Sequence, residues 1–415
     1  MAKRSIACSV VAPMDRQMIR DGAVVFDEGV ILAIGSAAEM ARAHPDAALE
    51  DLGEGILLPG LVNAHTHLEL SGCAADTFAG ATFADWILSL RSRMTAAGAT
   101  LEEAAAAGVR AGARQCLRFG VTTVGDITQH GHITRPLLAA GPLGGVSYGE
   151  VLGLAKLRRQ FDELFARAVD TRHESEFLKV GLTPHAPYTV DQPGYEQALK
   201  TARQRKLPLA SHLAETADEQ TFLEHHAGEF RDIWDKLGLW EEPVQTFRGP
   251  PLQFAQAIGL LDYPTLLAHV NYCDNEGLNL LARGQASVVY CPRTHKYFRH
   301  PPHRWREMIG RGINVAVGTD SCASSPDLNL VDDLCLLHEI APDVPPHALW
   351  EMATIRGAAA LQQAERIGSL TPGKQADFVY FPAAGDDPLR DILERSIVPE
   401  KVWVRGNSID DLLRR

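Results

Sequence analysis

Cysteine is scarce in this chain and is not arranged for cross-linking or for zinc. The 415 residues include seven cysteines, an odd number, scattered from Cys8 to Cys335 without a C-x-x-C pair. This pattern argues against the disulfide framework of a secreted protein and against a cysteine zinc site. We therefore expect a reducing, cytoplasmic environment.

Long apolar runs and an excess of basic charge are absent too. No segment reaches the roughly 18 apolar residues that a membrane span requires, and Asp15 breaks the apolar start so early that we expect no signal peptide. Lys and Arg number 40 against 52 Asp and Glu, which gives a net charge of -12. Nucleic acids and anionic membranes need a basic patch. We therefore expect neither as a partner and expect a small-molecule substrate, while a homodimer stays open.

The composition fits a globular protein with one large domain and a smaller companion, since 46% of the residues are hydrophobic and 22% are charged. Residues 1–56 show short strand patterns, and at Leu57 the pattern changes to apolar strands that alternate with helical stretches. Strand patterns return after about Ile367. We predict a small β-domain built from residues 1–56 and 368–415, with residues 57–367 as the large domain.

The large domain contains eight strand patterns separated by helical segments. Eight parallel strands with intervening helices make a (β/α)₈ barrel of the TIM type, an α/β fold whose active site forms at the carboxyl ends of the strands. The strands are predicted at residues 60–67, 120–127, 144–151, 178–185, 207–215, 265–272, 286–292 and 313–320. Two connections are long, residues 68–100 and 216–262, and their aromatic content favours ordered lids.

Several of these strands end on a histidine or an acid. In Leu61–His67 the side chains of a strand alternate between faces, so His65 and His67 point the same way and can meet one metal ion. Taken alone, this H-x-H pair proves little, because two histidines on a strand can also be ordinary polar residues at a sheet end. Its setting favours a ligand pair, because other strands end on Asp126, Glu150, His185, His212, Glu215, His269 and Asp320.

A set of short motifs runs in order along nearly the whole chain. They are PGLVNAHTHLEL, TPHAPYTV, SHLAE, LLAHVNY, VYCP, VGTDS and GSLTPGKQADFVYF. In this order the sequence resembles the amidohydrolase superfamily, and within it the metal-dependent deaminases and chlorohydrolases, a group that includes guanine, S-adenosylhomocysteine and aminodeoxyfutalosine deaminases. The resemblance implies a (β/α)₈ barrel with a composite β-sandwich from both termini, in agreement with the strand pattern.

The resemblance also implies a metal site. Matched to the family's motifs, the ligands are His65, His67, His212 and Asp320. Three imidazoles and a carboxylate suit zinc or iron(II), and zinc is the expected ion. Relatives with two metals carry a modified lysine at the end of strand four, where this chain has His185, so one divalent ion is expected.

Three residues match the family's catalytic positions. The resemblance implies that Glu215 protonates a ring nitrogen of the substrate, that His269 hydrogen-bonds the attacking oxygen, and that Asp320 accepts a proton from water. A structural explanation exists for two of them. Asp320 before Ser321, and Glu215 before a helical stretch, are also typical of helix caps.

Substrate contacts follow less directly from the motifs. His185, Trp86 and Ser324 match positions that contact the substrate in relatives. The chain departs from the family at Cys291-Pro292-Arg293-Thr294-His295, where many nucleobase deaminases have C-P-x-S-N. We expect Arg293 either to pair with a carboxylate or phosphate of the substrate or to pair with acidic residues of the rim.

These features predict a mononuclear metal-dependent aminohydrolase of an amino-substituted heterocycle, most plausibly a purine nucleoside derivative such as aminodeoxyfutalosine. The same site would also serve a chlorohydrolase or a cyclic amidohydrolase, because only the leaving group differs. A non-catalytic barrel scaffold is the remaining alternative, and the complete set of ligand positions speaks against it.

Overall fold

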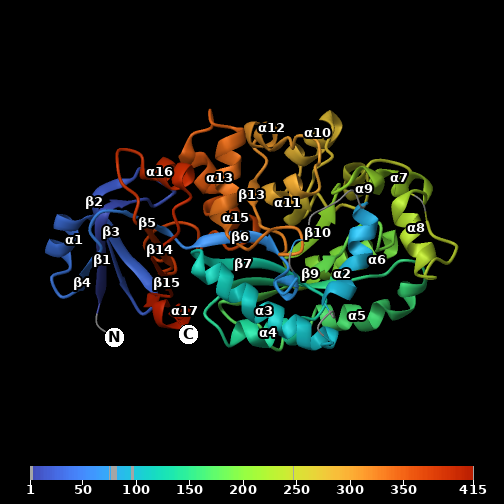
Figure 1. Ribbon diagram of the computed structural model, residues 1–415, viewed down its shortest axis with the longest axis horizontal. Coiled ribbons are helices and arrows are strands. Elements are labelled where there is room, and N and C mark those ends of the chain that lie inside the picture. Colours follow the sequence, from blue (N-terminus) through green and yellow to red (C-terminus); the bar gives the residue numbers. More distant parts are fainter. Residues whose placement is uncertain (1–2, 74, 76–81, 95–97, 246, 415) are drawn as a thin grey trace.

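The computed structural model describes residues 3–73, 75, 82–94, 98–245 and 247–414. Two β-sheets organise the chain, one from its middle and one from its two ends (Figure 1). Within the described ranges, no helix is both long and apolar enough to cross a membrane.

The middle of the chain forms an eight-stranded parallel sheet whose strands follow one another in sequence order. A bridge between Thr66 and Asp320 joins the first strand to the segment after the last one, so the sheet closes into a barrel. The strands are β6 (Leu61–Thr66), β7 (Val121–Thr128), β8 (Gly144–Val151), β9 (Leu178–Pro184), β10 (Leu209–Leu213), β11 (Thr265–His269), β12 (Ser287–Tyr290) and β13 (Val315–Val317). Each overlaps one predicted strand, and the predicted barrel is confirmed.

Helices surround this barrel (Figure 1), and β7 and β8 are buried at every position because helices cover the outer face of a parallel sheet. The helices of this part are α2 (Phe83–Met94), α3 (Leu101–Arg118), α4 (Gly131–Ala139), α5 (Phe161–Ala168), α6 (Gln192–Arg205), α7 (Ala217–His225), α8 (Glu229–Lys236), α9 (Pro251–Ala257), α10 (Asn275–Arg283), α11 (Pro292–Tyr297), α12 (Trp305–Gly310), α13 (Leu330–Ile340), α14 (Pro346–Met352) and α15 (Ile355–Ala360), with 3₁₀ turns η1 (Leu68–Leu70) and η2 (Ala155–Gln160).

The turn that follows β6 packs tightly against α3. Thr100 and Glu103 form a capping box that begins this helix. A Cβ atom at Gly108 would lie only 2.2 Å from the carbonyl oxygen of Glu69, so glycine is needed for the close approach of α3 to η1. This contact holds the backbone next to His67.

Both ends of the chain build the second sheet, at the left of Figure 1. β1 (Arg4–Val11) pairs with β4 (Ala48–Asp51) along its first half and with β5 (Ile56–Pro59) along its second half, so the sheet forks and encloses a small core. β5 also pairs with β14 (Phe378–Phe381) from the other end of the chain. The predicted composite domain is therefore confirmed. Its other elements are β2 (Ile19–Asp27), β3 (Val30–Ser36), β15 (Lys401–Val404), β16 (Asn407–Ser408), α1 (Ala37–Ala43), α16 (Pro388–Arg395) and α17 (Asp410–Arg414).

The two sheets share one hydrophobic core where they meet. Val10 of β1 and Leu58 of β5 belong to the same buried cluster as Val121 of the barrel. Because apolar packing crosses the junction, the parts are not separated by a gap in the core. The domain boundaries after residues 56 and 367 stay a prediction.

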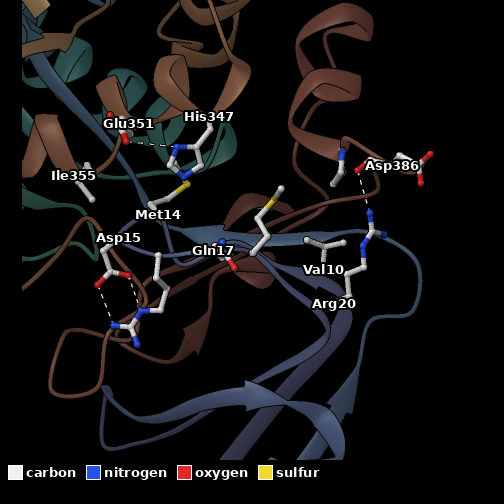
Figure 2. Close-up of a pocket in the computed structure, with 12 residues that line it drawn as sticks. Val10, Met14, Asp15, Gln17, Arg20, His347, Glu351, Ile355 and Asp386 are labelled. Carbon is white, nitrogen blue, oxygen red and sulfur yellow. Dashed lines mark hydrogen bonds and ion pairs between the residues drawn. The ribbon is translucent and has the colours of Figure 1, made fainter.

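A cavity of about 630 Å³ opens at this junction, between the β1–β2 connection and α14 (Figure 2). Among its lining residues, Arg16 donates to the adjacent Asp15 at 3.0 Å. Nδ1 of His347 lies 3.5 Å from a carboxylate oxygen of Glu351 (Figure 2). None of the residues predicted for the functional site lines this cavity. Predicted site residues such as His65, His212 and His269 lie instead at the carboxyl ends of the barrel strands.

Candidate active site

The first barrel strand carries His65 into the interior of the protein. Every residue of β6 is buried, and the exposed fraction of His65 is 0%. Neither ring nitrogen of His65 has a hydrogen-bond partner within the described part of the chain. Burial lowers the pKa of His65 well below its usual value, so the ring is neutral. An orphaned, neutral, buried imidazole is unfavourable for stability by itself and well suited to bind a cation.

His67 and His212 bring two more imidazoles to the same place. Their Nε2 atoms are 3.2 Å apart. Nδ1 of His212 donates to the carbonyl oxygen of His185 at 3.2 Å, so the lone pair of the neutral ring is on Nε2. Burial lowers the pKa of His67 and of His212 to about 3, which keeps both rings neutral. Both Nε2 atoms can therefore act as ligands at neutral pH.

Asp320 is held beside these histidines by the seam that closes the barrel. Its backbone nitrogen donates to the carbonyl oxygen of His65 at 3.1 Å, and its backbone is left-handed with φ +57°. Its Oδ1 atom lies 3.8 Å from Nε2 of His65 and 3.8 Å from Nε2 of His67. Burial raises the pKa of Asp320 to about 7. A cation between these donors would favour the ionised carboxylate.

The four residues predicted as metal ligands thus converge, and their donor set fits a divalent ion. The ligand atoms of His65, His67 and Asp320 lie within 4.8 Å of one another, as do those of His65, His212 and His269. Imidazole nitrogens with one carboxylate suit zinc and iron(II). A third group of the same kind consists of Glu150, His185 and His212. The assignment of ligands within this cluster stays a prediction.

Glu215, directly after β10, faces the same cluster. Its exposed fraction is 5%, and its Oε1 atom lies 3.4 Å from Nε2 of His269. The hydroxyl of Tyr188 donates to Oε2 at 3.5 Å. Burial, and then the charge of Asp320, raise the pKa of Glu215 well above its usual value. The raised pKa favours the protonated form of this side chain, which can donate a proton.

The position of Glu215 depends on a second glutamate that the sequence analysis missed. Glu219 is fully buried, and its carboxylate accepts hydrogen bonds from the backbone nitrogens of Ala214 at 2.9 Å and of Glu215 at 3.0 Å. This fixes the turn in which Ala214 adopts φ +52°. The acidic spacing in E-T-A-D-E was visible in the sequence, but it is equally typical of the first turn of an exposed helix.

His269 stands on a strained turn at the end of β11. His269 has φ +72° and Val270 has φ +52°, a backbone region that side chains with a Cβ atom rarely adopt. Nε2 of His303 donates to the carbonyl oxygen of His269 at 2.9 Å, and the His303 ring stacks on Tyr290 with centroids 4.1 Å apart. The hydrogen bond from His303 therefore helps to hold the backbone of this turn in place.

The segment 295–303, which carries His295, His300 and His303, also supports Glu215. Nδ2 of Asn271 donates to the carbonyl oxygen of Glu215 at 3.0 Å, and Nδ1 of His295 donates to Oδ1 of Asn271 at 3.1 Å. His295 stands where the C-P-x-S-N pattern has asparagine. The sequence favours a rim or substrate contact slightly over a surface position for His295, and it does not predict the bond to Asn271, because Asn271 follows a different strand, β11.

A cavity of about 360 Å³ connects these groups to an apolar wall. Its polar lining consists of His67, Glu69, Gln129, His130, Glu150, His185, Thr189, His212, Glu215, His269, Asp320 and Ser321. Nδ1 of His130 lies 3.0 Å from Glu69, and Gln129 donates to Glu150 at 2.6 Å. Glu69 was not predicted as a site residue, although it stands only two residues beyond His67.

Two of the residues predicted to contact substrate line this cavity. Trp86 does so from α2, and its Nε1 donates to the carbonyl oxygen of Ala323 at 3.3 Å. His185 follows β9, and its Nδ1 lies 2.7 Å from the hydroxyl oxygen of Thr189. That hydroxyl donates to the carbonyl of Ala186, so it accepts from Nδ1, and Nε2 of His185 keeps its lone pair. Both side chains are placed to contact a ligand.

Ser324 and Arg293 are placed differently and do not line this cavity. The hydroxyl of Ser324 donates to Oδ2 of Asp320 at 3.1 Å, so Ser324 supports the carboxylate instead of facing the open space. Arg293 donates through Nε to Asp333 at 2.9 Å and through Nη1 to Asp327 at 2.7 Å. Of the two alternatives for Arg293, this arrangement favours the ion pair with acidic residues, and substrate contact by Arg293 or Ser324 stays a prediction.

These features define a class of protein: a (β/α)₈ hydrolase whose site combines convergent histidines with buried acids at the carboxyl ends of the strands. Comparison with known families agrees. The model of the amidohydrolase family matches residues 56–409, and the chain belongs to this family. A model of the bacterial imidazolonepropionase-like composite domain matches residues 22–47, within the sheet made from both ends.

Individual relatives are similar over most of their length. The chain is 30% identical to aminodeoxyfutalosine deaminase of Deinococcus radiodurans, over 89% of this chain and 87% of the relative. It is 28% identical to 5-methylthioadenosine/S-adenosylhomocysteine deaminase of Nitratidesulfovibrio vulgaris, over 90% of this chain and 82% of that one. A crystal structure of adenosine deaminase from Xanthomonas campestris with bound zinc superposes with a TM-score of 0.79 at 25% identity, covering 97% of this chain and 92% of that chain. The family, the donor set and the zinc in this neighbour support one conclusion, a divalent metal ion in the site.

Proposed function

We propose that this protein is a mononuclear, metal-dependent hydrolytic deaminase that acts on the amino group of a purine nucleoside. The observation that carries the proposal is the buried Glu215 carboxyl group, 3.4 Å from His269 in the cavity that the convergent histidines line. A site for simple hydrolysis needs an activated water. A buried proton donor next to that site can protonate a ring nitrogen, as deamination of a heterocycle requires. Similarity to two groups of nucleoside deaminases supports the same reaction.

In this proposal His65, His67, His212 and Asp320 hold the metal ion, and the ion is zinc. When bound, a divalent ion lowers the pKa of a coordinated water molecule and so supplies the nucleophile at neutral pH. Zinc is supported by the nitrogen-rich donor set and by the zinc in the Xanthomonas neighbour. Elemental analysis of freshly purified protein distinguishes zinc from iron(II).

The proton transfers are assigned to Glu215, His269 and Asp320. Glu215 donates its proton to a ring nitrogen, which makes the carbon that bears the amino group electrophilic. Asp320 accepts a proton from the attacking water, and the neutral His269 ring hydrogen-bonds the oxygen as it adds. The amino group then takes the proton held by Asp320 and leaves as ammonia as the carbon–nitrogen bond breaks. The added hydroxyl group gives its proton to the Glu215 carboxylate, so the ring keeps a carbonyl group and both side chains return to their starting states.

We expect the purified protein to release ammonia from adenine nucleosides and to convert them to the corresponding 6-oxo compounds. The test is an ammonia-release assay over adenosine derivatives, guanine, pterin and triazine compounds, with the product identified by mass spectrometry. Enzyme carrying Glu215→Gln serves as the control for contaminating deaminases. Activity limited to amide or chloro substrates would contradict deamination and would favour the chlorohydrolase or cyclic amidohydrolase alternative.

The hydrogen bond from His303 to the carbonyl oxygen of His269 leads to a prediction about kcat. In His303→Phe the ring can still stack on Tyr290, but the hydrogen bond to the carbonyl of His269 is lost. We expect kcat to fall by about 10-fold, which corresponds to about 1.4 kcal/mol, because the strained turn no longer holds His269 in place. KM and metal content should stay unchanged, since His303 does not line the cavity.

The conservative variant His303→Gln separates this positioning role from a purely structural one. Its amide can donate to the same carbonyl, so kcat should recover relative to His303→Phe. Steady-state kinetics and thermal unfolding of both variants provide the check. If His303→Phe lowers only the melting temperature and leaves kcat and KM as in the wild type, the hydrogen bond from His303 has no part in catalysis.

A further inference from the structure

The segment 295–303, which consists of the last turn of α11 and the loop after it, reaches the backbone of His269 at one end. Nε2 of His303 lies 2.9 Å from the carbonyl oxygen of His269, and a carbonyl oxygen only accepts, so the neutral ring carries its proton on Nε2. Nδ1 of the same ring is buried and has no partner within the described part of the chain. An unpartnered buried nitrogen costs stability. The ring therefore serves the contact with His269 better than it serves the stability of the fold.

The other end of the segment reaches the backbone of Glu215 through an amide. Nδ2 of Asn271 donates to the carbonyl oxygen of Glu215 at 3.0 Å, which leaves Oδ1 of Asn271 facing Nδ1 of His295 at 3.1 Å. Because Oδ1 only accepts, Nδ1 of His295 is the donor, and this bond fixes the orientation of the amide. Asn271 and His295 are both buried, so the two bonds are shielded from water. His295 therefore controls whether Asn271 can hold Glu215.

The backbone is strained at both contacts. Ala214, directly before Glu215, has φ +52°, and His269 and Val270 have φ +72° and φ +52°. Residues with a Cβ atom keep such conformations only where the surrounding contacts support them. Hydrogen bonds to the carbonyl oxygens of Glu215 and His269 supply this support. Loss of either hydrogen bond would allow its turn to relax and would move the attached side chain.

The two contacts together bear on the distance between Glu215 and His269. Oε1 of Glu215 lies 3.4 Å from Nε2 of His269. The proposed reaction uses both groups on one substrate, because Glu215 protonates a ring nitrogen while His269 hydrogen-bonds the oxygen that adds to the ring. Such a set of groups has to be held within roughly 0.5 Å of its productive geometry, and a misplacement of roughly 1 Å can cost roughly 100-fold in rate. The relative position of the two side chains is therefore decisive for this step.

We propose that the segment 295–303 is a positioning element, and that its first and last residues, His295 and His303, hold Glu215 and His269 at a fixed distance from each other. The inference rests on the proposed deaminase function, because that function uses both groups on one substrate. Neither of the two positioning histidines lines the active-site cavity. They act through the backbone of the residues that do.

The inference also accounts for the departure of this chain from the C-P-x-S-N pattern. Asparagine at position 295 would carry its amide nitrogen on Cγ, the same atom that carries Nδ1 in histidine. Either side chain can therefore donate to Oδ1 of Asn271 from nearly the same place. We expect His295→Asn to keep the kcat of the wild type, and His295→Phe, which has no donor, to lower kcat by about 10-fold.

The test of a single positioning element compares metal-loaded His295→Phe, His303→Phe and the protein that carries both changes. If the segment sets one distance, the loss of either contact releases the pair, and the second loss adds little. We expect all three proteins to lower kcat by about 10-fold, with KM and metal content as in the wild type. Independent contacts would multiply to about 100-fold, and this result overturns the inference, as does the wild-type kcat in His295→Phe. Lys296→Gln, at an exposed position of the same segment, is the control.

Crystal structures of the variants separate failure of this inference from failure of the proposed function. The distance between Oε1 of Glu215 and Nε2 of His269 should lengthen by about 0.5 Å or more in both phenylalanine variants and stay unchanged in His295→Asn. Asn271→Asp, which loses only the donor to Glu215, should lengthen it too and serves if a phenylalanine variant does not fold. If the distance lengthens but the wild type deaminates no nucleoside, the positioning element stands and the deaminase proposal falls. An unchanged distance in the folded variants overturns the inference whatever the activity.

Discussion

Glu215→Gln is expected to lower kcat by roughly 10² to 10⁴-fold, the usual contribution of a positioned general acid or base. Glutamine has nearly the same shape as the protonated side chain, but its amide is a very weak acid and cannot supply the proton. Burial holds the pKa of Glu215 well above its usual value, which favours the protonated form that the proposed step uses. Steady-state kinetics with the best substrate of the ammonia-release assay measure the effect.

The metal content of the Glu215→Gln protein shows whether kcat falls because the proton donor is missing or because the metal ion is lost. Glu215 is not one of the four proposed ligands, so the Glu215→Gln protein should hold as much metal as the wild type. Glu163→Gln, at an exposed position of α5, is the control for a change of charge alone. Wild-type turnover in Glu215→Gln would show that proton transfer has been misassigned, and loss of metal would show that Glu215 is itself a ligand.

His212→Ala is expected to abolish both metal binding and turnover. Its neutral Nε2 atom lies 3.2 Å from Nε2 of His67, so the two imidazoles can hold the same ion. Changing a residue that merely supports a metal ligand already costs 10- to 100-fold in affinity, so removal of a ligand should cost roughly 100-fold or more. Elemental analysis after gel filtration, together with the activity at increasing zinc concentration, gives the result. His173→Ala, in an exposed loop, controls for the loss of a histidine alone.

His185→Ala distinguishes the proposed site from the neighbouring group of Glu150, His185 and His212. If the ion is held by His65, His67, His212 and Asp320, this variant keeps its metal, and its main effect is a higher KM. Loss of the ion from His185→Ala, with full retention in His65→Ala, would move the site to the other group. His212 belongs to both, so it cannot separate them.

The barrel and the convergent histidines were predictable because the signals for them are local. Alternating side chains put His65 and His67 on one face of β6 whatever the rest of the chain does. The apolar runs that end on His212 and His269 mark strand ends by hydrophobicity alone, and parallel strands bring their carboxyl ends to one edge. The family motifs then assign roles, and the structure brings the same residues together.

The surroundings of the site were not predictable in the same way. Arg293 carries the charge and shape to bind an anionic substrate, but Asp333, 40 residues further along the chain, is buried and pairs with it. His303 stands in a polar segment typical of a surface loop, yet it braces His269 across 34 residues. Local sequence patterns do not report such contacts, because they depend on how separate elements pack.

By itself, the sequence determined the order of the eight strands and the polar residues that end them, because alternation and hydrophobicity act between neighbours in the chain. Only the tertiary structure decided which charges reach the cavity. It directs Arg293, Arg158 and Arg159 to carboxylates outside the cavity lining and turns the apolar faces of α2 and α8 toward the cavity. For the largely buried Arg293 the physical reason is desolvation: a buried charge is stable only beside a partner, and the fold supplies Asp327 and Asp333 from a distant part of the chain.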